Sequence, residues 1–351
     1  MSGTLLRLAC TAAMAAQVAL APAPALAAPQ PQPQPQRTVA QLLTDLQRLY
    51  RQTEQAAETY NATAEKLTAQ RAEVKRLDGQ LAKARLALRG SRVDAGRLAR
   101  EQYQNSSNFS VYVRLLLARD PQQALDEGHV IGRVAGERAA ALDRLTGAEK
   151  RADALARSAR RALDTQLTLA GKQKKQRDDV TRRLADVERL LASLTPAQRG
   201  EVSRLEQDGV ARAQRSLTDS GALGHDRPAS PVGGQAVRYA LDQLGKPYRW
   251  GAEGPASFDC SGLTSRAWAH AGTPIPRTSQ EQWARLPHIP LNSLRPGDLV
   301  IYFPEATHVA LYLGDGKVVQ APRPGDKVKI SPLAANPVLG AVRPDAAPRR
   351  L

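Results

Sequence analysis

Cysteine and aromatic residues are the scarcest features of this 351-residue chain, which has two cysteines and 4% aromatic residues. There is no HExxH motif and no Cys/His cluster with metal-ligand spacing, so the sequence predicts neither a metal nor any other cofactor. The net charge of +16 is not interleaved with aromatic side chains, and nucleic-acid binding is therefore not expected. No segment beyond the N-terminus has an apolar run that would span a bilayer.

The N-terminus has the features of a secretory signal peptide at residues 1–27. Arg7 precedes an apolar run, and Ala25-Leu-Ala27 fits an A-x-A cleavage site. We expect an exported product, either secreted or associated with the extracellular cell wall. Because Cys10 would leave with the signal peptide, Cys260 would be the single thiol of the mature protein. An unpaired extracellular thiol favours a nucleophile, and a buried packing cysteine is the alternative.

Composition divides the rest of the chain. Residues 28–37 form a Pro/Gln leader that we expect to be disordered, and residues 38–219 contain no tryptophan, whereas all three tryptophans lie in the last third. Residues 220–234 are rich in Gly, Pro and Ser and predict a flexible linker. A compact domain over 235–345 and a tail over 346–351 complete the predicted organisation.

Periodicity predicts that the region 38–219 is an all-α coiled coil. Fifteen positions from 39 to 88 alternate in steps of three and four, and twelve are apolar. The pattern returns at Leu142, Leu145, Ala152 and Leu155 and again from Val180 to Leu194, after a break near 104–125. We expect an antiparallel pair of long helices, with an intermolecular coil as the alternative.

The last third predicts an α+β domain, because short helical segments precede five strand-like runs that fit an antiparallel sheet. Cys260 begins a predicted helix, where free backbone N–H groups favour the thiolate. His308 begins a predicted strand, and a tight turn leads to a second strand that ends at Gln320, so hairpin pairing would bring the two together. Spacing favours His308 over His270 and His288 as a base, with a packed structural histidine as the alternative.

Five short motifs follow one another in this region, and their order and spacing are those of a known family. They are Phe258-Asp-Cys-Ser-Gly-Leu263, Pro276-Arg-Thr-Ser279, Leu294-Arg-Pro-Gly-Asp-Leu-Val300, His308-Val-Ala-Leu-Tyr-Leu-Gly314 and Val319-Gln-Ala-Pro322. Together they resemble the NlpC/P60 family of papain-like cell-wall cysteine peptidases over roughly residues 233–345. The N-terminal coil joined to such a domain also resembles the cell-separation endopeptidases of Gram-positive bacteria.

The resemblance implies a role for seven residues. Cys260 would be the nucleophile and His308 the base. Gln320 takes the third polar position, which is commonly histidine in the family; its amide carbonyl can still orient the imidazole. The remaining four would shape the oxyanion and substrate sites: Tyr248, Asp259, Ser261 and Arg277, the last with a structural role as an alternative.

The implied function is a secreted peptidoglycan D,L-endopeptidase that cuts stem peptides between D-glutamate and the diamino acid through a thioester. The alternatives are an inactive or partner-activated scaffold or wall-binding protein, and an amidase of the same fold. For the coil, the sequence leaves open docking on a membrane partner, restraint of the catalytic domain, and a simple spacer.

Overall fold

The computed structural model describes residues 37–105, 113, 120–225 and 227–346. The predicted signal peptide, most of the predicted leader and most of the predicted break at 104–125 lie outside these residues. From Val39 onward the chain forms one compact unit. Within the described ranges, no helix combines the length and apolar character needed to cross a membrane.

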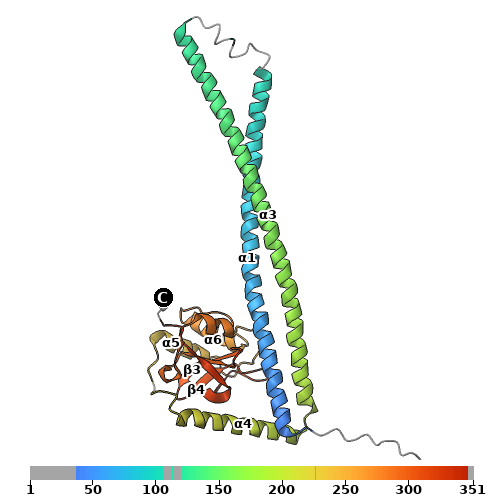
Figure 1. Cartoon of the computed structure of the whole chain (residues 1–351), viewed down its shortest axis with the longest axis vertical. Coiled ribbons are helices and arrows are strands. Elements are labelled where there is room, and N and C mark those ends of the chain that lie inside the picture. The colour runs from blue at the N-terminus through green and yellow to red at the C-terminus, as the bar shows by residue number, and fades with distance from the viewer. Residues whose placement is uncertain (1–36, 106–112, 114–119, 226, 347–351) are drawn as a thin grey trace, which may run out of the picture. The chain divides into compact units, whose positions relative to one another are not determined.

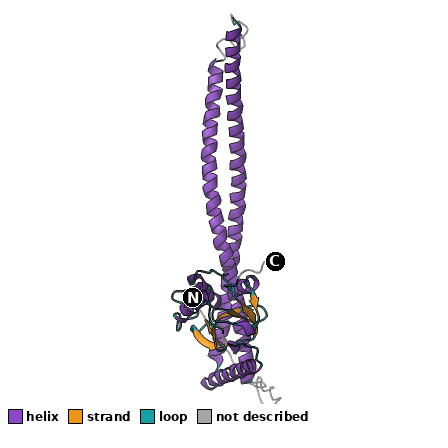
Figure 2. Ribbon diagram, turned by 90° about the vertical axis from the view of Figure 1, so that its left-hand side faces the viewer, coloured by secondary structure: helices purple, strands orange, loops and turns teal. Residues whose placement is uncertain are grey.

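Two long helices, α1 (Val39–Asn105) and α3 (Pro121–Ser193), pack side by side in opposite directions (Figures 1 and 2). The start of α1 meets the end of α3, and the middle of α1 meets the middle of α3. Buried side chains form a cluster at each of these two levels. The first cluster contains Leu42, Leu46 and Tyr50 with Val187 and Leu194, and the second contains Leu77 and Leu81 with Ala159 and Ala162. The predicted antiparallel pair of long helices is confirmed.

The predicted stripe on α1 is accurate, since none of its fifteen positions is exposed. On α3 the prediction is wrong at Leu142, which is 60% exposed, while the neighbouring Ala141 is only 3% exposed. At this level of the helix pair, Ala141 faces α1 and belongs to the buried stripe of α3. The adjacent Leu142 therefore points outward.

Helix α4 (Pro196–Asp219) follows α3 after a short break at Leu194-Thr195. Thr195 caps the helix: its hydroxyl accepts the N–H of Gln198, whose side chain in turn accepts the N–H of Thr195. Val202 packs at the base of the helix pair, and Leu217 packs against the C-terminal core. Helix α4 therefore contacts both the helix pair and the C-terminal domain.

The C-terminal domain combines three short helices with a six-stranded antiparallel sheet of order β1-β6-β2-β3-β4-β5. The helices are α5 (Pro231–Leu241), α6 (Cys260–His270) and α7 (Ser279–Arg285), with 3-10 turns at Leu291–Ser293 and Leu333–Ala335. The strands are β1 (His288–Ile289), β2 (Leu299–Tyr302), β3 (His308–Gly314), β4 (Lys317–Gln320), β5 (Lys329–Pro332) and β6 (Val338–Val342). The predicted α+β class with an antiparallel sheet is confirmed, and the two-residue β1 is the strand that the sequence did not indicate. Helix α5 begins at Pro231, inside the segment predicted as a linker.

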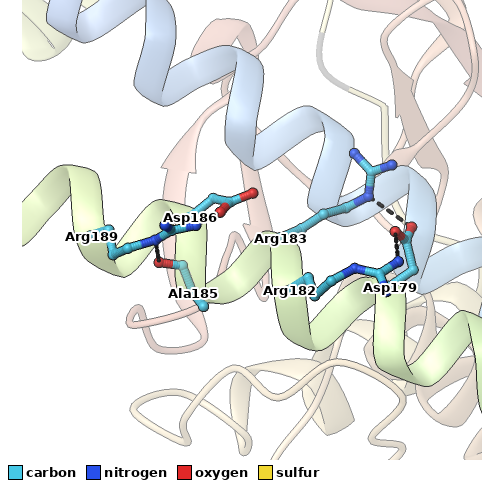
Figure 3. Close-up of a pocket in the computed structure, with 6 residues that line it drawn as sticks. All are labelled: Asp179, Arg182, Arg183, Ala185, Asp186 and Arg189. Carbon is cyan, nitrogen blue, oxygen red and sulfur yellow. Dashed lines mark hydrogen bonds and ion pairs between the residues drawn. The ribbon is translucent and has the colours of Figure 1, made fainter.

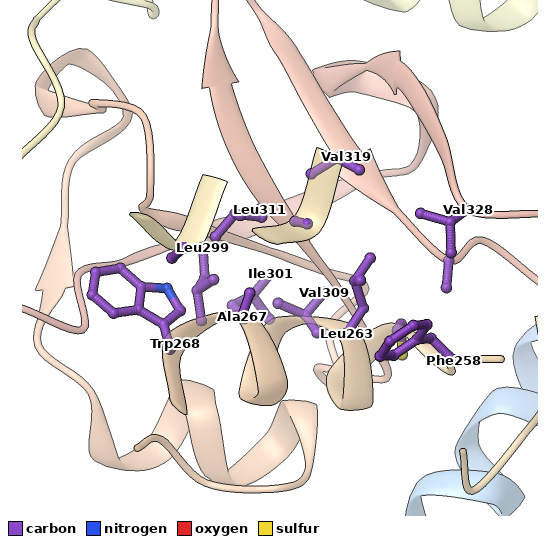
Figure 4. Close-up of a cluster of buried hydrophobic side chains, with 14 of the residues drawn as sticks. Phe258, Leu263, Ala267, Trp268, Leu299, Ile301, Val309, Leu311, Val319 and Val328 are labelled. Atoms are coloured by element: carbon purple, nitrogen blue, oxygen red, sulfur yellow. The ribbon is translucent and has the colours of Figure 1, made fainter. Parts of the chain in front are cut away.

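Both faces of the sheet are covered, which explains why its central strands are apolar throughout. Leu299 and Ile301 of β2 face α5 and α6, where Trp268 and Leu263 complete the core (Figure 4). Val300 and Tyr302 face the opposite side, toward Leu333 and Leu217 of α4. The buried indole of Trp268 donates a hydrogen bond to the Gly297 carbonyl at 3.1 Å, which fixes α6 against the loop before β2. This packing places Cys260, the first residue of α6, in the same core cluster as Val309 of β3, next in sequence to His308.

Candidate active site

Cys260 occupies the first position of α6, and Asp259 is the N-cap. The Asp259 carboxylate accepts the N–H of Gly262 at 2.6 Å, which satisfies one of the free donors at the helix start. The thiol is only 2% exposed, and it is a free cysteine. The capped turn thus holds the sulfur in a fixed position facing β3.

His308 and Gln320 are brought together by the antiparallel pairing of β3 and β4. The imidazole Nε2 lies 2.6 Å from the Gln320 Oε1, so the amide oxygen accepts the Nε2 proton and leaves Nδ1 as the unprotonated nitrogen. Nδ1 is buried, and no residue in the described part of the chain is hydrogen-bonded to it. Burial lowers the pKa of His308 to about 4, so the ring is neutral at neutral pH. The pair therefore presents an oriented base with a free lone pair.

Asp259, Ser261 and Arg277 form one buried polar network. Arg277 binds Asp259 through two bonds of 2.7 and 3.0 Å and donates to the Ser261 hydroxyl at 2.9 Å. A third contact joins Arg277 to Glu253 at 2.8 Å. The guanidinium of Arg277 is 7% exposed, and the carboxylates raise its pKa despite the burial. The network fixes the loop before α7 against the start of α6.

Arg277→Ala is expected to lower the free energy of unfolding by about 3–5 kcal/mol, because it leaves the buried Asp259 carboxylate without its cation. Denaturant titration followed by circular dichroism would measure the change. Arg285→Ala is the matched control, since its ion pair with Glu281 is exposed and is worth less than about 1 kcal/mol. Equal effects of the two variants would contradict a stabilising role for the network.

Three polar residues of α1 also enter this site, and the sequence did not predict them. Glu58 Oε1 accepts the Ser261 hydroxyl at 2.6 Å and lies 3.8 Å from the Cys260 sulfur, while its Oε2 accepts the Ser279 N–H at 2.9 Å. One turn earlier, Glu54 lies 3.5 Å from Nδ1 of His308. One turn later, Asn61 donates to Asp259 at 3.1 Å. A segment about 200 positions away in the sequence thus contacts the thiol and faces the imidazole.

Aromatic packing supports the same contact. Tyr60 of α1 packs edge-on against Trp250, with ring centroids 5.0 Å apart. In the sequence, Glu54, Glu58 and Asn61 recur at steps of four and three beside the apolar stripe of α1. That spacing was a usable signal, but a polar stripe on a long helix is normally a solvated face.

The electrostatics of the thiol differ from the expectation based on the helix start. Burial raises the pKa of Cys260 well above its usual value, and the carboxylates of Glu58, Asp259 and Glu54 add to the increase. A smaller opposing effect comes from the N–H of Val309. The helix-start argument was local, and it is outweighed here by burial and by carboxylates from elsewhere in the chain. In this arrangement Cys260 is a neutral thiol.

The predicted oxyanion residue, Tyr248, is buried beside the same groups. Burial raises the pKa of its hydroxyl, and the nearby carboxylates of Asp259, Glu54 and Glu58 act in the same direction. The other two histidines of the domain pack against aromatic rings instead. His270 lies against Tyr239, and His288 stacks on Trp283 and contacts its backbone carbonyl.

A hollow lies on the surface of α3, lined by residues between Asp179 and Arg189. Its lining side chains pair with one another along one helix, with Asp179 bound to Arg183 at 2.8 Å and to Arg182 at 3.0 Å (Figure 3). Because these charges already satisfy each other on an open helix face, the hollow offers little to a ligand. Among the described residues, no group of His, Cys, Asp and Glu side chains is arranged to hold a metal ion.

Comparison with known proteins agrees with the geometry. Residues 245–341 match the family model described as the NlpC/P60 family. The chain is 42% identical over 120 residues to probable endopeptidase Cgl2188 of Corynebacterium glutamicum, covering 34% of this chain and 57% of that protein. It is 37% identical over 108 residues to probable endopeptidase Rv2190c of Mycobacterium tuberculosis, covering 30% and 28% of the two chains. The matches therefore span less than two thirds of these relatives.

Among solved structures, the chain is similar to the NlpC/p60 domain of the peptidoglycan hydrolase SagA. The two are 32% identical with a TM-score of 0.30, and the match covers 32% of this chain and 97% of that one. The residues matched by the family model lie in the C-terminal third of the chain.

Proposed function

Since residues 245–341 form an NlpC/P60 domain at the C-terminus of the chain, we propose that the protein is a cysteine endopeptidase acting on the stem peptides of peptidoglycan. The observation that carries the proposal is the oriented, neutral imidazole of His308, whose unpartnered Nδ1 lies in the same buried site as the Cys260 thiol. The probable endopeptidases to which the domain is similar support the same reaction class.

In the proposed mechanism, Nδ1 of His308 takes the proton from Cys260, and the thiolate attacks the carbonyl carbon of the scissile amide. The tetrahedral intermediate collapses to a thioester as His308 returns the proton to the leaving amine. Water then attacks the thioester, with His308 again as base, and releases the carboxylate product. Gln320 holds the ring orientation through both steps.

The substrate-binding roles follow from the polar network. We assign the Tyr248 hydroxyl to the oxyanion, where a neutral donor in a buried site stabilises developing charge. Asp259, Ser261 and Arg277 would shape the pocket for the short stem peptide, and the bond cut would be that between D-glutamate and the diamino acid. Export to the cell wall belongs to the same proposal, and the net charge of +16 suits anionic wall polymers.

We also propose that α1 restrains the enzyme. Cys260 and His308 are both buried, and the side chains of Glu54 and Glu58 lie where a substrate would approach their reactive atoms. A peptide cannot reach the thiol until α1 moves away. This contact favours restraint over the spacer alternative for the helix pair.

The test is mass spectrometry of purified peptidoglycan incubated with the full chain and with a chain that begins at Thr195. The shorter chain keeps α4, because Leu217 of α4 packs on the core of the domain. New fragments ending at D-glutamate are expected, and more of them from the shorter chain. Fragments with other ends would show that a different bond is cut. If neither chain cleaves peptidoglycan, the proposed peptidase activity is wrong. Equal activity of the two chains would contradict restraint by α1.

Gln320→Leu is expected to lower kcat by about 10²-fold, the order of a general acid–base contribution. The buried Nε2–H would lose its acceptor, and the tautomer that leaves Nδ1 free would no longer be favoured. Steady-state kinetics of the chain from Thr195 and nitrogen chemical shifts of His308 would measure the two effects. Gln320→His restores an acceptor and should retain most of the activity. Unchanged shifts and kcat in the leucine variant would rule out an orienting role.

A further inference from the structure

The contact between α1 and the thiol site contains more carboxylates than cations. Glu54 and Glu58 of α1 are buried beside Asp259, which gives three acidic groups around one thiol. The buried cation of the site, Arg277, already makes two bonds to Asp259 and one to Glu253.

The two glutamates of α1 bond to neutral groups. Within the described residues, Glu58 receives its hydrogen bonds from a hydroxyl, a backbone N–H, the Cys260 thiol at 3.8 Å and the Asn61 amide at 3.5 Å. Glu54 faces the imidazole of His308, which is neutral. Arg323 attracts Glu54 at longer range, but it is engaged by Glu206 at 2.6 and 2.9 Å. Neither glutamate therefore has a cation bonded to it.

A buried carboxylate without a bonded cation is costly, and such groups bind a proton instead. Burial and, after it, the nearby charge of Asp259 raise the pKa of Glu58 to about 7, although hydrogen bonds from Ser261 and Ser279 and the charge of Arg277 oppose the increase. Burial and the charge of Glu58 likewise raise the pKa of Glu54 well above its usual value. On an α1 that has left the site, both side chains would face water and titrate near their ordinary values.

We propose that α1 is a proton-linked latch: Glu54 and Glu58 close the thiol site in their protonated form, and their ionisation favours release of α1. The latch rests on the proposed function, because it regulates the site that performs the reaction. Opening would be driven by a local rise in pH, which removes the protons from the two glutamates.

The direction of the effect follows from the groups that face the latch. The raised pKa values of the two glutamates make closure most favourable below about pH 4.5, and this advantage is lost as the pH rises through the raised pKa of each, which is about 7 for Glu58. His308 acts in the opposite sense, since its lowered pKa means that closure expels a proton from the ring below about pH 6.5. The remaining groups keep one charge state across this window: the neutral Cys260 and Tyr248, and the cations Arg277 and Arg323.

The experiment measures alkylation of Cys260 by iodoacetamide in the full chain between pH 5 and pH 8, with the Cys260 peptide quantified by mass spectrometry. The same rates are measured for the double variant Glu54→Gln/Glu58→Gln, which keeps the shape of the latch but cannot ionise. The ratio of the two rates at each pH cancels the titration of the thiol and of His308. The ratio of unmodified chain to variant is expected to increase by at least about tenfold from pH 5 to pH 8, corresponding to one unit of pKa shift.

Glu65→Gln is the matched control, because Glu65 lies on the exposed face of α1, and its ratio should stay constant. A constant ratio for the double variant would overturn the latch. Circular dichroism shows whether the helices still form in the double variant. If they do not, the two single variants are measured instead, and each should show part of the increase in the alkylation-rate ratio. Alkylation of the thiol does not require turnover, so the alkylation result would hold even if the protein did not cleave peptidoglycan. Conversely, cleavage of peptidoglycan together with an alkylation-rate ratio that does not change with pH would reject the latch and support the peptidase.

Discussion

Replacing Cys260 with alanine is expected to lower the rate of peptidoglycan cleavage by at least about 10³-fold, the order seen when a covalent nucleophile is removed. Without the sulfur, the thioester cannot form, and His308 has no thiol proton to remove. The measurement is the release of stem-peptide fragments by the chain from Thr195, followed by mass spectrometry over time.

Ser265→Ala serves as the control for this variant. Ser265 lies further along α6, and its hydroxyl donates to the Gly262 carbonyl at 3.2 Å within the same helix, so its removal should change the rate by no more than a few-fold. Cleavage by Cys260→Ala at a rate near that of the control would exclude the thiol as nucleophile.

Introducing lysine at both latch positions, Glu54→Lys/Glu58→Lys, is expected to raise the activity of the full chain by at least about 10²-fold. Two ammonium groups would be buried near Arg277 without a free carboxylate for each, and an uncompensated buried charge costs about 3–5 kcal/mol. Helix α1 would therefore leave the site. The activity of this variant should approach that of the chain from Thr195.

The comparison variant is Glu65→Lys, which adds the same charge to the exposed face of the same helix and should leave the activity unchanged. Helical content measured by circular dichroism shows whether α1 and α3 still form. A double lysine variant with intact helices and unchanged activity would mean that α1 does not limit access to the thiol.

The sequence predicted what local patterns determine. A period of 3.5 residues identified the buried stripe of α1, and short strand-like runs bounded by turns identified five of the six strands, including the pairing that joins His308 to Gln320. Strand β1 escaped because two residues carry no periodicity. The exposure of Leu142 was missed because apolar spacing does not say which of two adjacent residues fits the partner helix.

The approach of α1 to the thiol was not predictable in the same way. Glu54 and Glu58 have no local feature that connects them to Cys260, some 200 residues away, and their polarity suggested a solvated face. The state of the thiol depended on that missing contact. A helix start favours the thiolate only where the surroundings are neutral or positive, and here they are acidic.

The length of α1 gives the latch a mechanical property. At 67 residues the helix is about 100 Å long, and Glu58 lies about 30 Å from its beginning. A stiff rod that pivots at the cluster around Leu42 would move Glu58 by roughly 2.5 Å when its far end moves by about 10 Å. A sideways pull at that end would act on the contacts of Glu58 with about fourfold leverage. The helix pair would thus convert a weak lateral force far from the thiol into the rupture of a few short hydrogen bonds beside it.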